Sequence, residues 1–169
     1  MAQALHERLE QWIQCGHTGG LVLGEARVGK TRAIKSIGGK LTNRSGQPIH
    51  LFYTHYGLRD QQTVRAVFAK LAKAIGFDVA RQSSDTLFEW IVMRLSEAAL
   101  ANDTRQVVLI VDEAQQLTMG QLNAYAEIYN DLFENGINFV VIFVANLDQF
   151  EVMRQGLLRR ENRYLRERF

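Results

Sequence analysis

The residues best suited to chemistry are the eight of Gly24–Thr31, which read GEARVGKT. Their spacing, G-x-x-x-x-G-K-[ST], is that of a loop that cradles phosphates. The glycines let the backbone approach a ligand, and successive N–H groups face the phosphates at the positive end of the next helix. Lys30 would reach the β- and γ-phosphates there, and the Thr31 hydroxyl would hold Mg²⁺. The predicted nucleotide-binding residues are Gly24, Glu25, Ala26, Arg27, Val28, Gly29, Lys30, Thr31 and Arg32.

The residues on either side of this loop favour the strand–loop–helix context that it needs. The apolar run Leu21–Leu23 leads directly into Gly24, as a buried strand would. Lys30–Ile37 can continue as a helix that places its apolar residues on one face. The alternative is a glycine-rich turn that binds no ligand.

A second candidate group is the acidic pair Asp112 and Glu113, which follows the five apolar residues Val107–Val111. Such a run is typical of a strand buried on both faces of a parallel sheet. Ligands bind outside the carboxyl ends of these strands. Asp112 is therefore expected to hold Mg²⁺ together with Thr31, and Glu113 to activate water as a general base. The alternative is a solvated acidic pair at a strand end.

Asn146 follows a further apolar run, Phe139–Ala145. An amide at the end of that strand can bridge the attacking water and the γ-phosphate. Asparagine is also common in turns at strand ends for local reasons, so its position relative to the other groups carries this interpretation.

Six arginines and no lysine lie between Met153 and Phe169, namely Arg154, Arg159, Arg160, Arg163, Arg166 and Arg168. Three interpretations stay open: a solvated helix face, contacts to DNA phosphates, or an arginine finger that stabilises transition-state charge. The finger requires an oligomer, because a residue this far along the chain is hard to bring to its own subunit's nucleotide.

The remaining pattern alternates strands with helices. Helices are expected at 2–15, 30–37, 63–75, 84–100, 118–134 and 148–169, and strands at 21–23, 49–54, 107–111 and 139–145. This order predicts an α/β fold with a parallel sheet, helices on both faces and right-handed crossovers. The length of 169 residues suits one domain.

Composition narrows the class of protein. Apolar residues make up 47% of the chain, so a folded core is expected, and the net charge of only +2 permits a local nucleic-acid surface without requiring one. Cys15 is the only cysteine, which excludes a disulfide framework within the chain and fits a reducing cytoplasm. The first residues lack the apolar core of a signal peptide, and no apolar run approaches the roughly 20 residues of a membrane span.

Together these motifs resemble those of AAA+ ATPases. Gly24–Thr31 resembles Walker A, Val107–Glu113 Walker B, Asn146 sensor 1, and residues 165–169 (LRERF) the box VII segment. The resemblance spans roughly residues 16–169 and implies a three-layer P-loop core with ATP and Mg²⁺ as cofactors. Residues 1–169 are expected to form one such domain, which begins with an amphipathic helix at 1–15. The catalytic residues that the resemblance implies are Glu113, Lys30, Asn146 and Arg168, with Arg166 and Arg163 as weaker finger candidates.

AAA+ modules usually continue into a fifth strand and a helical lid, which the sequence does not contain. The resemblance therefore leads us to expect weakened nucleotide affinity and hydrolysis.

Val111–Leu117 (VDEAQQL) further resembles the D-E-A-x-x-L pattern of TnsC/TniB/MuB-type transposition regulators. That resemblance implies an ATP-dependent homo-oligomer on double-stranded DNA, bound without sequence preference, that recruits a transposase or target-selection protein. The implied DNA contacts are Arg59, Arg65 and Arg81, with Thr63 and Ser83 as neutral phosphate donors.

The VDEAQQL motif is also similar to that of ExeA-type secretion-linked ATPases. A nucleotide-gated scaffold without turnover and a small-molecule P-loop kinase are further alternatives.

Overall fold

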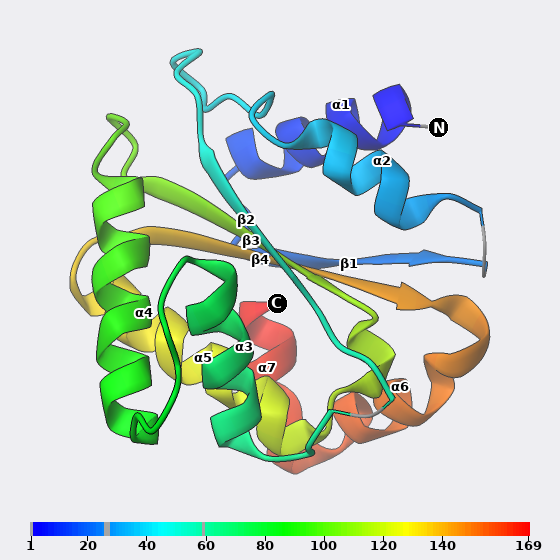
Figure 1. The fold of residues 1–169 in the computed structure, drawn as a ribbon. Helices are drawn as coiled ribbons and strands as arrows, with labels where there is room; N and C mark the ends of the chain where they lie inside the picture. The colour runs from blue at the N-terminus through cyan, green and yellow to red at the C-terminus, as the bar shows by residue number, and fades with distance from the viewer. Residues whose placement is uncertain (1, 26–27, 59) are drawn as a thin grey trace.

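The computed structural model describes residues 2–25, 28–58 and 60–169. Within these ranges, four parallel strands form one sheet, ordered β1-β4-β3-β2 (Figure 1). The strands are β1 (Gly19–Gly24), β2 (His50–His55), β3 (Gln106–Asp112) and β4 (Asn138–Asn146). Each connection between consecutive strands contains at least one helix, so the predicted α/β parallel-sheet core is confirmed.

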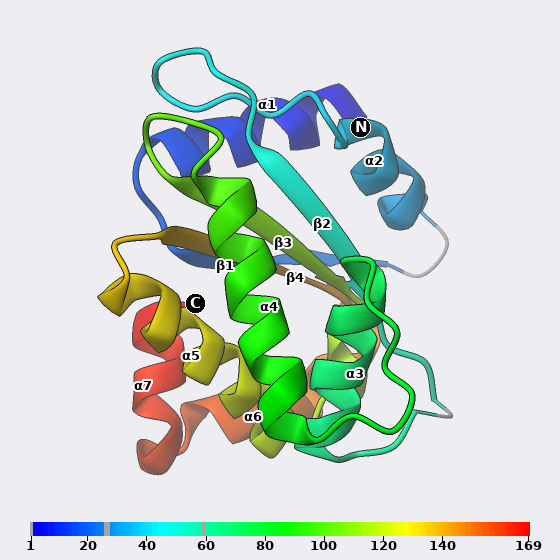
Figure 2. The same cartoon turned by 60° about the vertical axis from the view of Figure 1, so that its left-hand side comes forward.

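Helices cover both faces of this sheet (Figures 1 and 2). One face carries α1 (Ala2–Gln14) and α2 (Lys30–Ile37). The other face carries α3 (Val64–Ala74), α4 (Ser84–Ala99), α5 (Met119–Glu134), α6 (Glu151–Leu158) and α7 (Arg163–Arg168). Short 3-10 turns occur at Ala114–Gln116, Leu147–Gln149 and Arg160–Asn162. These layers make the three-layer architecture that the sequence predicts.

β3 is the centre of the core, because all seven of its residues are buried. Side chains alternate between the two faces of a strand. Accordingly Val107, Leu109 and Val111 pack with α3, α4 and α5, while Val108 and Ile110 pack under α1 and α2. The strand thus carries Asp112 to the carboxyl edge of the sheet on a backbone that is fixed from both sides.

Three details differ from the sequence prediction. Ser83, and not Ser84, caps α4, since its hydroxyl accepts a hydrogen bond from the Thr86 N–H at 3.1 Å. The stretch at 148–169 is divided into α6 and α7, because the backbone becomes extended at Arg159. The apolar pattern of the helices expected at 84–100 and 118–134 also predicts that Met93, Leu100 and Phe133 face the core, but they are 48%, 61% and 64% exposed, because they lie off the buried stripe of their helices.

The position of β1 depends on a close approach between α1 and Gly20. A Cβ atom on Gly20 would lie only 2.3 Å from the ring of Trp12. The absent side chain therefore lets the indole pack directly on the strand that leads into Gly24. In the described residues, no helix is long and apolar enough to cross a membrane.

We expect Gly20→Ala to lower the free energy of unfolding by about 1–3 kcal/mol, because the added methyl group must displace the packed Trp12 ring. Urea denaturation followed by tryptophan fluorescence measures this loss. Gly120→Ala is the matched control in the exposed first turn of α5 and should keep stability or raise it by up to about 1 kcal/mol. Wild-type stability of Gly20→Ala would contradict the close packing.

Candidate functional site

The register of the sheet brings the predicted site residues to one edge. Gly24, the last residue of β1, pairs with Asn146, the last of β4, and Asp112 at the end of β3 pairs with His55 of β2. β4 lies between β1 and β3. The loop after β1, the acidic pair after β3 and Asn146 therefore share the carboxyl edge, where ligands bind in such sheets.

Lys30 folds back over the loop that precedes it. Its ammonium group donates hydrogen bonds to the carbonyl oxygens of Gly24 (2.7 Å) and Glu25 (2.5 Å). Gly29 caps α2 in the left-handed region, at φ 86°, which a residue with a side chain rarely adopts. An ammonium has three donors, so one of those on Lys30 remains for a ligand.

The other predicted loop residues fall into two groups. Glu25, Val28 and Arg32 are exposed beside Lys30. Ala26 and Arg27 lie outside the described residues. The described geometry of the loop around Lys30 is therefore defined by Gly24 and Glu25, whose carbonyls bind Lys30, and by Gly29, which caps α2.

Thr31 and Asp112 meet in a direct hydrogen bond, 2.6 Å from the threonine Oγ1 to the aspartate Oδ2. The carboxylate is acceptor-only, so the hydroxyl donates and its oxygen lone pairs stay available. Hydroxyl and carboxylate oxygens are the ligands that Mg²⁺ prefers, and it is commonly held by only one or two protein groups. The donor set of Thr31 and Asp112 therefore fits a magnesium ion bound together with phosphates.

Tyr53 on β2 is a third member of this cluster that the sequence interpretation missed. Its hydroxyl donates to the same Asp112 Oδ2 at 2.8 Å, and the Glu113 N–H donates to Oδ1 at 2.9 Å. Burial, and then the hydrogen bond to Asp112, raise the pKa of the Tyr53 phenol well above its usual range. Tyr53 thus stays a neutral donor that holds the Asp112 carboxylate, which is only 3% exposed.

Glu113 is exposed and has an unusual backbone. Its φ of 57° and ψ of 37° lie in the left-handed region, although it carries a side chain. Gln115 holds its carboxylate through a 2.5 Å hydrogen bond and also accepts from the Asn146 N–H at 3.1 Å. The Asn146 side chain accepts from the Asp148 N–H at 3.3 Å, in a turn at the end of β4. The structure thus joins Glu113 and Asn146 through Gln115, a second residue that the sequence interpretation missed.

The predicted finger residues lie at the other edge of the sheet. The Arg168 carbonyl accepts from the Thr18 hydroxyl at 2.7 Å, and Phe169 packs against Gly19. The six residues of β1 separate this point from Gly24 by about 17 Å. Arg163 pairs with Glu167, and Arg166 is exposed. The structure therefore does not bring these arginines to the chain's own loop, and a role at a neighbour's site remains a prediction.

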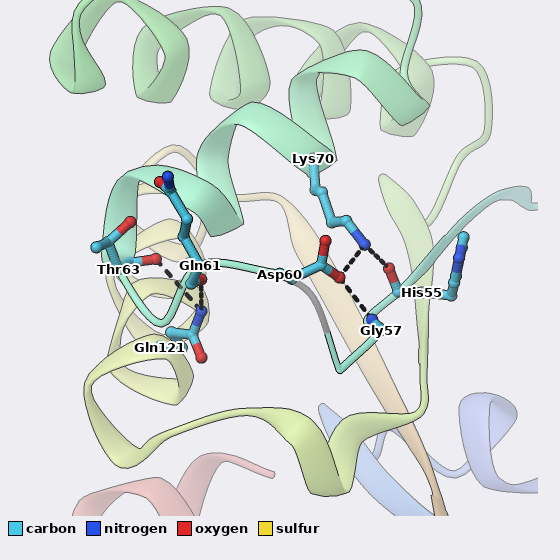
Figure 3. A network of polar contacts seen from close by, with 7 residues as sticks. All are labelled: His55, Gly57, Asp60, Gln61, Thr63, Lys70 and Gln121. Carbon is cyan, nitrogen blue, oxygen red and sulfur yellow. Dashed lines mark hydrogen bonds and ion pairs between the residues drawn. The ribbon is translucent and has the colours of Figure 1, made fainter.

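The loop between β2 and α3 is tied down at both ends (Figure 3). Lys70 binds the Asp60 carboxylate and the His55 carbonyl, the latter at 2.6 Å. The Gln121 amide donates to the carbonyls of Gln61 (3.0 Å) and Thr63 (3.3 Å). Burial opposes ionisation of Asp60, but the bonds from the Gly57 N–H and Lys70 outweigh it and lower the pKa of its carboxyl.

Two of the three predicted DNA contacts lie on this side of the molecule. The Arg65 guanidinium donates to the Gln82 carbonyl at 2.9 Å, which places it beside the turn that carries exposed Arg81. Both residues are close to the N-terminal ends of helices, α3 and α4, where Thr63 and Ser83 act as caps. Arg59 lies outside the described residues.

The loop at Gly29 opens a helix at the edge of a parallel sheet, and the Thr31–Asp112 pair lies beside it. This is the arrangement of a P-loop nucleotide-binding core. The sequence matches the AAA domain family over residues 15–153, and the chain belongs to that family. Among curated protein sequences, none matches.

Solved structures share the fold. Cdc6p from Pyrobaculum aerophilum is 19% identical, with a TM-score of 0.64 over 97% of this chain and 41% of its own. A chain of Drosophila ORC bound to DNA is 19% identical, with a TM-score of 0.56 over 89% and 38%. A chain of Drosophila ORC bound to GC-rich DNA and Cdc6 is 14% identical, with a TM-score of 0.61 over 99% and 27%. The chain thus spans less than half the length of each.

We expect Tyr53→Phe to lower the free energy of unfolding by about 1–2 kcal/mol, because buried Asp112 loses one of its donors. Thermal or urea denaturation measures the change. Tyr129→Phe is the control, since the Tyr129 hydroxyl makes no hydrogen bond within the described part of the chain, and should shift stability by less than about 0.5 kcal/mol. Equal effects of the two substitutions would contradict the assigned contact.

Proposed function

We propose that the chain binds and hydrolyses Mg-ATP as a homo-oligomer on double-stranded DNA, and that it thereby regulates target selection or transposase recruitment in DNA transposition. The observation that carries the nucleotide part is the 2.6 Å hydrogen bond between Thr31 and Asp112, next to the loop that Lys30 closes. The family supports an ATPase core in general. The transposition role rests on the VDEAQQL motif of residues 111–117.

Each site residue takes one role in this proposal. The backbone of Gly24–Thr31 and the Lys30 ammonium bind the phosphates, while Thr31 and Asp112 hold Mg²⁺. When bound, the ion neutralises charge on the phosphate oxygens. Glu113 accepts the proton of the attacking water, and Asn146 orients that water. Arg168 completes the site of a neighbouring copy, and residues 1–169 act as one AAA+ domain in the cytoplasm.

Substitutions of Lys30 and Glu113 should separate binding from turnover. Lys30→Ala should weaken ATP affinity by about 10- to 100-fold, the value of a charged hydrogen bond to phosphate. Glu113→Gln should keep the affinity and lower kcat by about 10²- to 10⁴-fold, because the general base is lost. Titration with a fluorescent ATP analogue and a phosphate-release assay measure the two quantities.

Glu127→Gln, on the exposed face of α5, is the control and should change neither quantity. A parallel loss of affinity and turnover in Glu113→Gln would contradict its role. Wild-type binding without phosphate release would favour a nucleotide-gated scaffold.

DNA binding is supported by position and by similarity. Arg65 and Arg81 lie where two helices begin, and helix N-termini add positive potential for phosphates. Two of the structurally similar chains belong to Drosophila ORC assemblies solved with DNA. Such contacts would grip the backbone without reading sequence.

In the presence of ATP, we expect Arg81→Ala to weaken binding to any duplex sequence and to reduce the slope of log K against log salt by about 1. Fluorescence anisotropy with labelled duplex at several salt concentrations measures this slope. Lys73→Ala, at the opposite end of α3 from Arg65, is the control and should bind like wild type. An unchanged slope in Arg81→Ala would remove this residue from the interface. Absence of any duplex affinity in wild type, with or without ATP, would favour the ExeA-type alternative.

A further inference from the structure

Gln115 joins two parts of the candidate site that are distant in sequence, the acidic pair after β3 and the residues at the end of β4. Its Nε2 donates to the Glu113 Oε2 at 2.5 Å and to the Gln149 Oε1 at 3.2 Å. Its Oε1 accepts from the backbone N–H of Asn146 at 3.1 Å. One half-buried side chain thus connects the acidic pair after β3 with the end of β4.

The orientation of this amide follows from the chemistry of its partners. An ionised carboxylate can only accept a hydrogen bond, and a backbone N–H can only donate one. The nitrogen of Gln115 must therefore face Glu113, and its oxygen must face Asn146. Rotating the amide by 180° would place its oxygen against the Glu113 carboxylate and its nitrogen against the Asn146 N–H. Both contacts therefore require the same orientation of the Gln115 amide.

The hydrogen bond from Gln115 holds the side chain of a residue, Glu113, whose backbone is strained. Glu113 stands in the left-handed region at φ 57°, a conformation that costs a residue with a side chain about 1–2 kcal/mol. Such strain persists where the surroundings hold it, here through the Glu113 N–H bonded to Asp112 and the Glu113 carboxylate bonded to Gln115. Through Gln115, the Glu113 carboxylate is tied to the backbone at the end of β4.

We propose that Gln115 is a positioning residue that fixes the Glu113 carboxylate against the end of β4, at the height where Asn146 stands. This inference rests on the proposed role of Glu113 as the base that activates water. With Oε2 engaged by Gln115, the second carboxylate oxygen has a defined direction, and within the described part of the chain no hydrogen bond occupies it, so it can accept the proton of water. The contacts of Gln115 are to Glu113, Gln149 and Asn146, so in this proposal its removal acts on turnover and leaves nucleotide binding unchanged.

The first test separates kcat from affinity. Gln115→Ala should lower kcat for ATP hydrolysis about tenfold or more, because misplacing a catalytic group by about 1 Å costs up to about 10²-fold. Its KM and its affinity for a fluorescent ATP analogue should stay within about twofold of wild type. Gln116→Ala, the neighbouring glutamine in the same 3-10 turn, is the matched control and should keep the wild-type kcat.

A second variant identifies which contact matters. Gln115→Glu keeps an acceptor for the Asn146 N–H but lacks the donor and sets a second negative charge against Glu113. Its kcat should fall at least as far as that of Gln115→Ala. Wild-type kcat in either variant, or a kcat that falls in step with nucleotide affinity, would overturn the proposal.

A spectroscopic arm tests the contact without any turnover. In ¹⁵N-labelled protein, the side-chain amide resonances of Gln115 are assigned by their absence in Gln115→Ala. Glu113→Ala should shift them and leave those of Gln116 in place, while unmoved Gln115 resonances would overturn the Gln115–Glu113 contact. If the wild-type chain releases no phosphate, the proposed hydrolysis is wrong. The Gln115–Glu113 contact is still tested in that case, because the NMR measurement does not depend on turnover.

Discussion

The structure of the site depends on one hydrogen bond, from the Thr31 hydroxyl to the Asp112 carboxylate, which spans 81 positions of the sequence. Thr31 lies at the start of α2, the helix that follows β1, whereas Asp112 ends β3, and β4 separates β1 from β3 in the sheet. α2 must therefore begin over the carboxyl edge and reach across it. The left-handed turn at Gly29 starts α2 in that direction, and the buried length of β3 holds Asp112 at the same height.

The same carboxylate links the nucleotide side of the sheet to β2. Asp112 accepts from Tyr53 through Oδ2, and its backbone carbonyl accepts from the Tyr56 N–H at 3.0 Å. Beyond Tyr56 begins the loop that Lys70 and Gln121 tie to α3 and α5 (Figure 3). Hydrogen bonds and short backbone segments therefore connect Thr31, through Asp112 and Tyr56, with the loop that leads into α3, the helix that carries Arg65.

Much of the fold follows from local patterns in the sequence. The apolar run at 107–111 predicted a strand buried on both faces, and the loop spacing of Gly24–Thr31 predicted the strand–loop–helix unit around it. Both predictions hold because their signals are short-range: hydrophobic periodicity and turn chemistry act over a few residues. The rule that ligands lie at the carboxyl edge then placed Asp112 near Thr31 without knowledge of the strand order.

What the sequence could not predict depends on register and on side-chain direction. In the sequence, Tyr53 is one of several aromatic residues in a predicted strand. Its contact with the Asp112 carboxylate depends on the register between β2 and β3, in which His55 pairs with Asp112. Gln115 stands within the predicted motif, but its role as a bridge needs the end of β4 beside it. The role of the terminal arginines stayed open for the same reason. α6 and α7 lead the chain back to the start of β1, and no local sequence pattern predicts that path.

The most direct test of the central claim is the Mg²⁺ dependence of ATP affinity, measured by calorimetric titration in Mg²⁺ and in EDTA. If Thr31 and Asp112 hold the ion, wild type binds ATP more tightly with Mg²⁺, and Asp112→Asn binds it equally in both buffers while keeping its fold by circular dichroism. An Asp112→Asn protein that retains the full wild-type gain from Mg²⁺ would contradict the account.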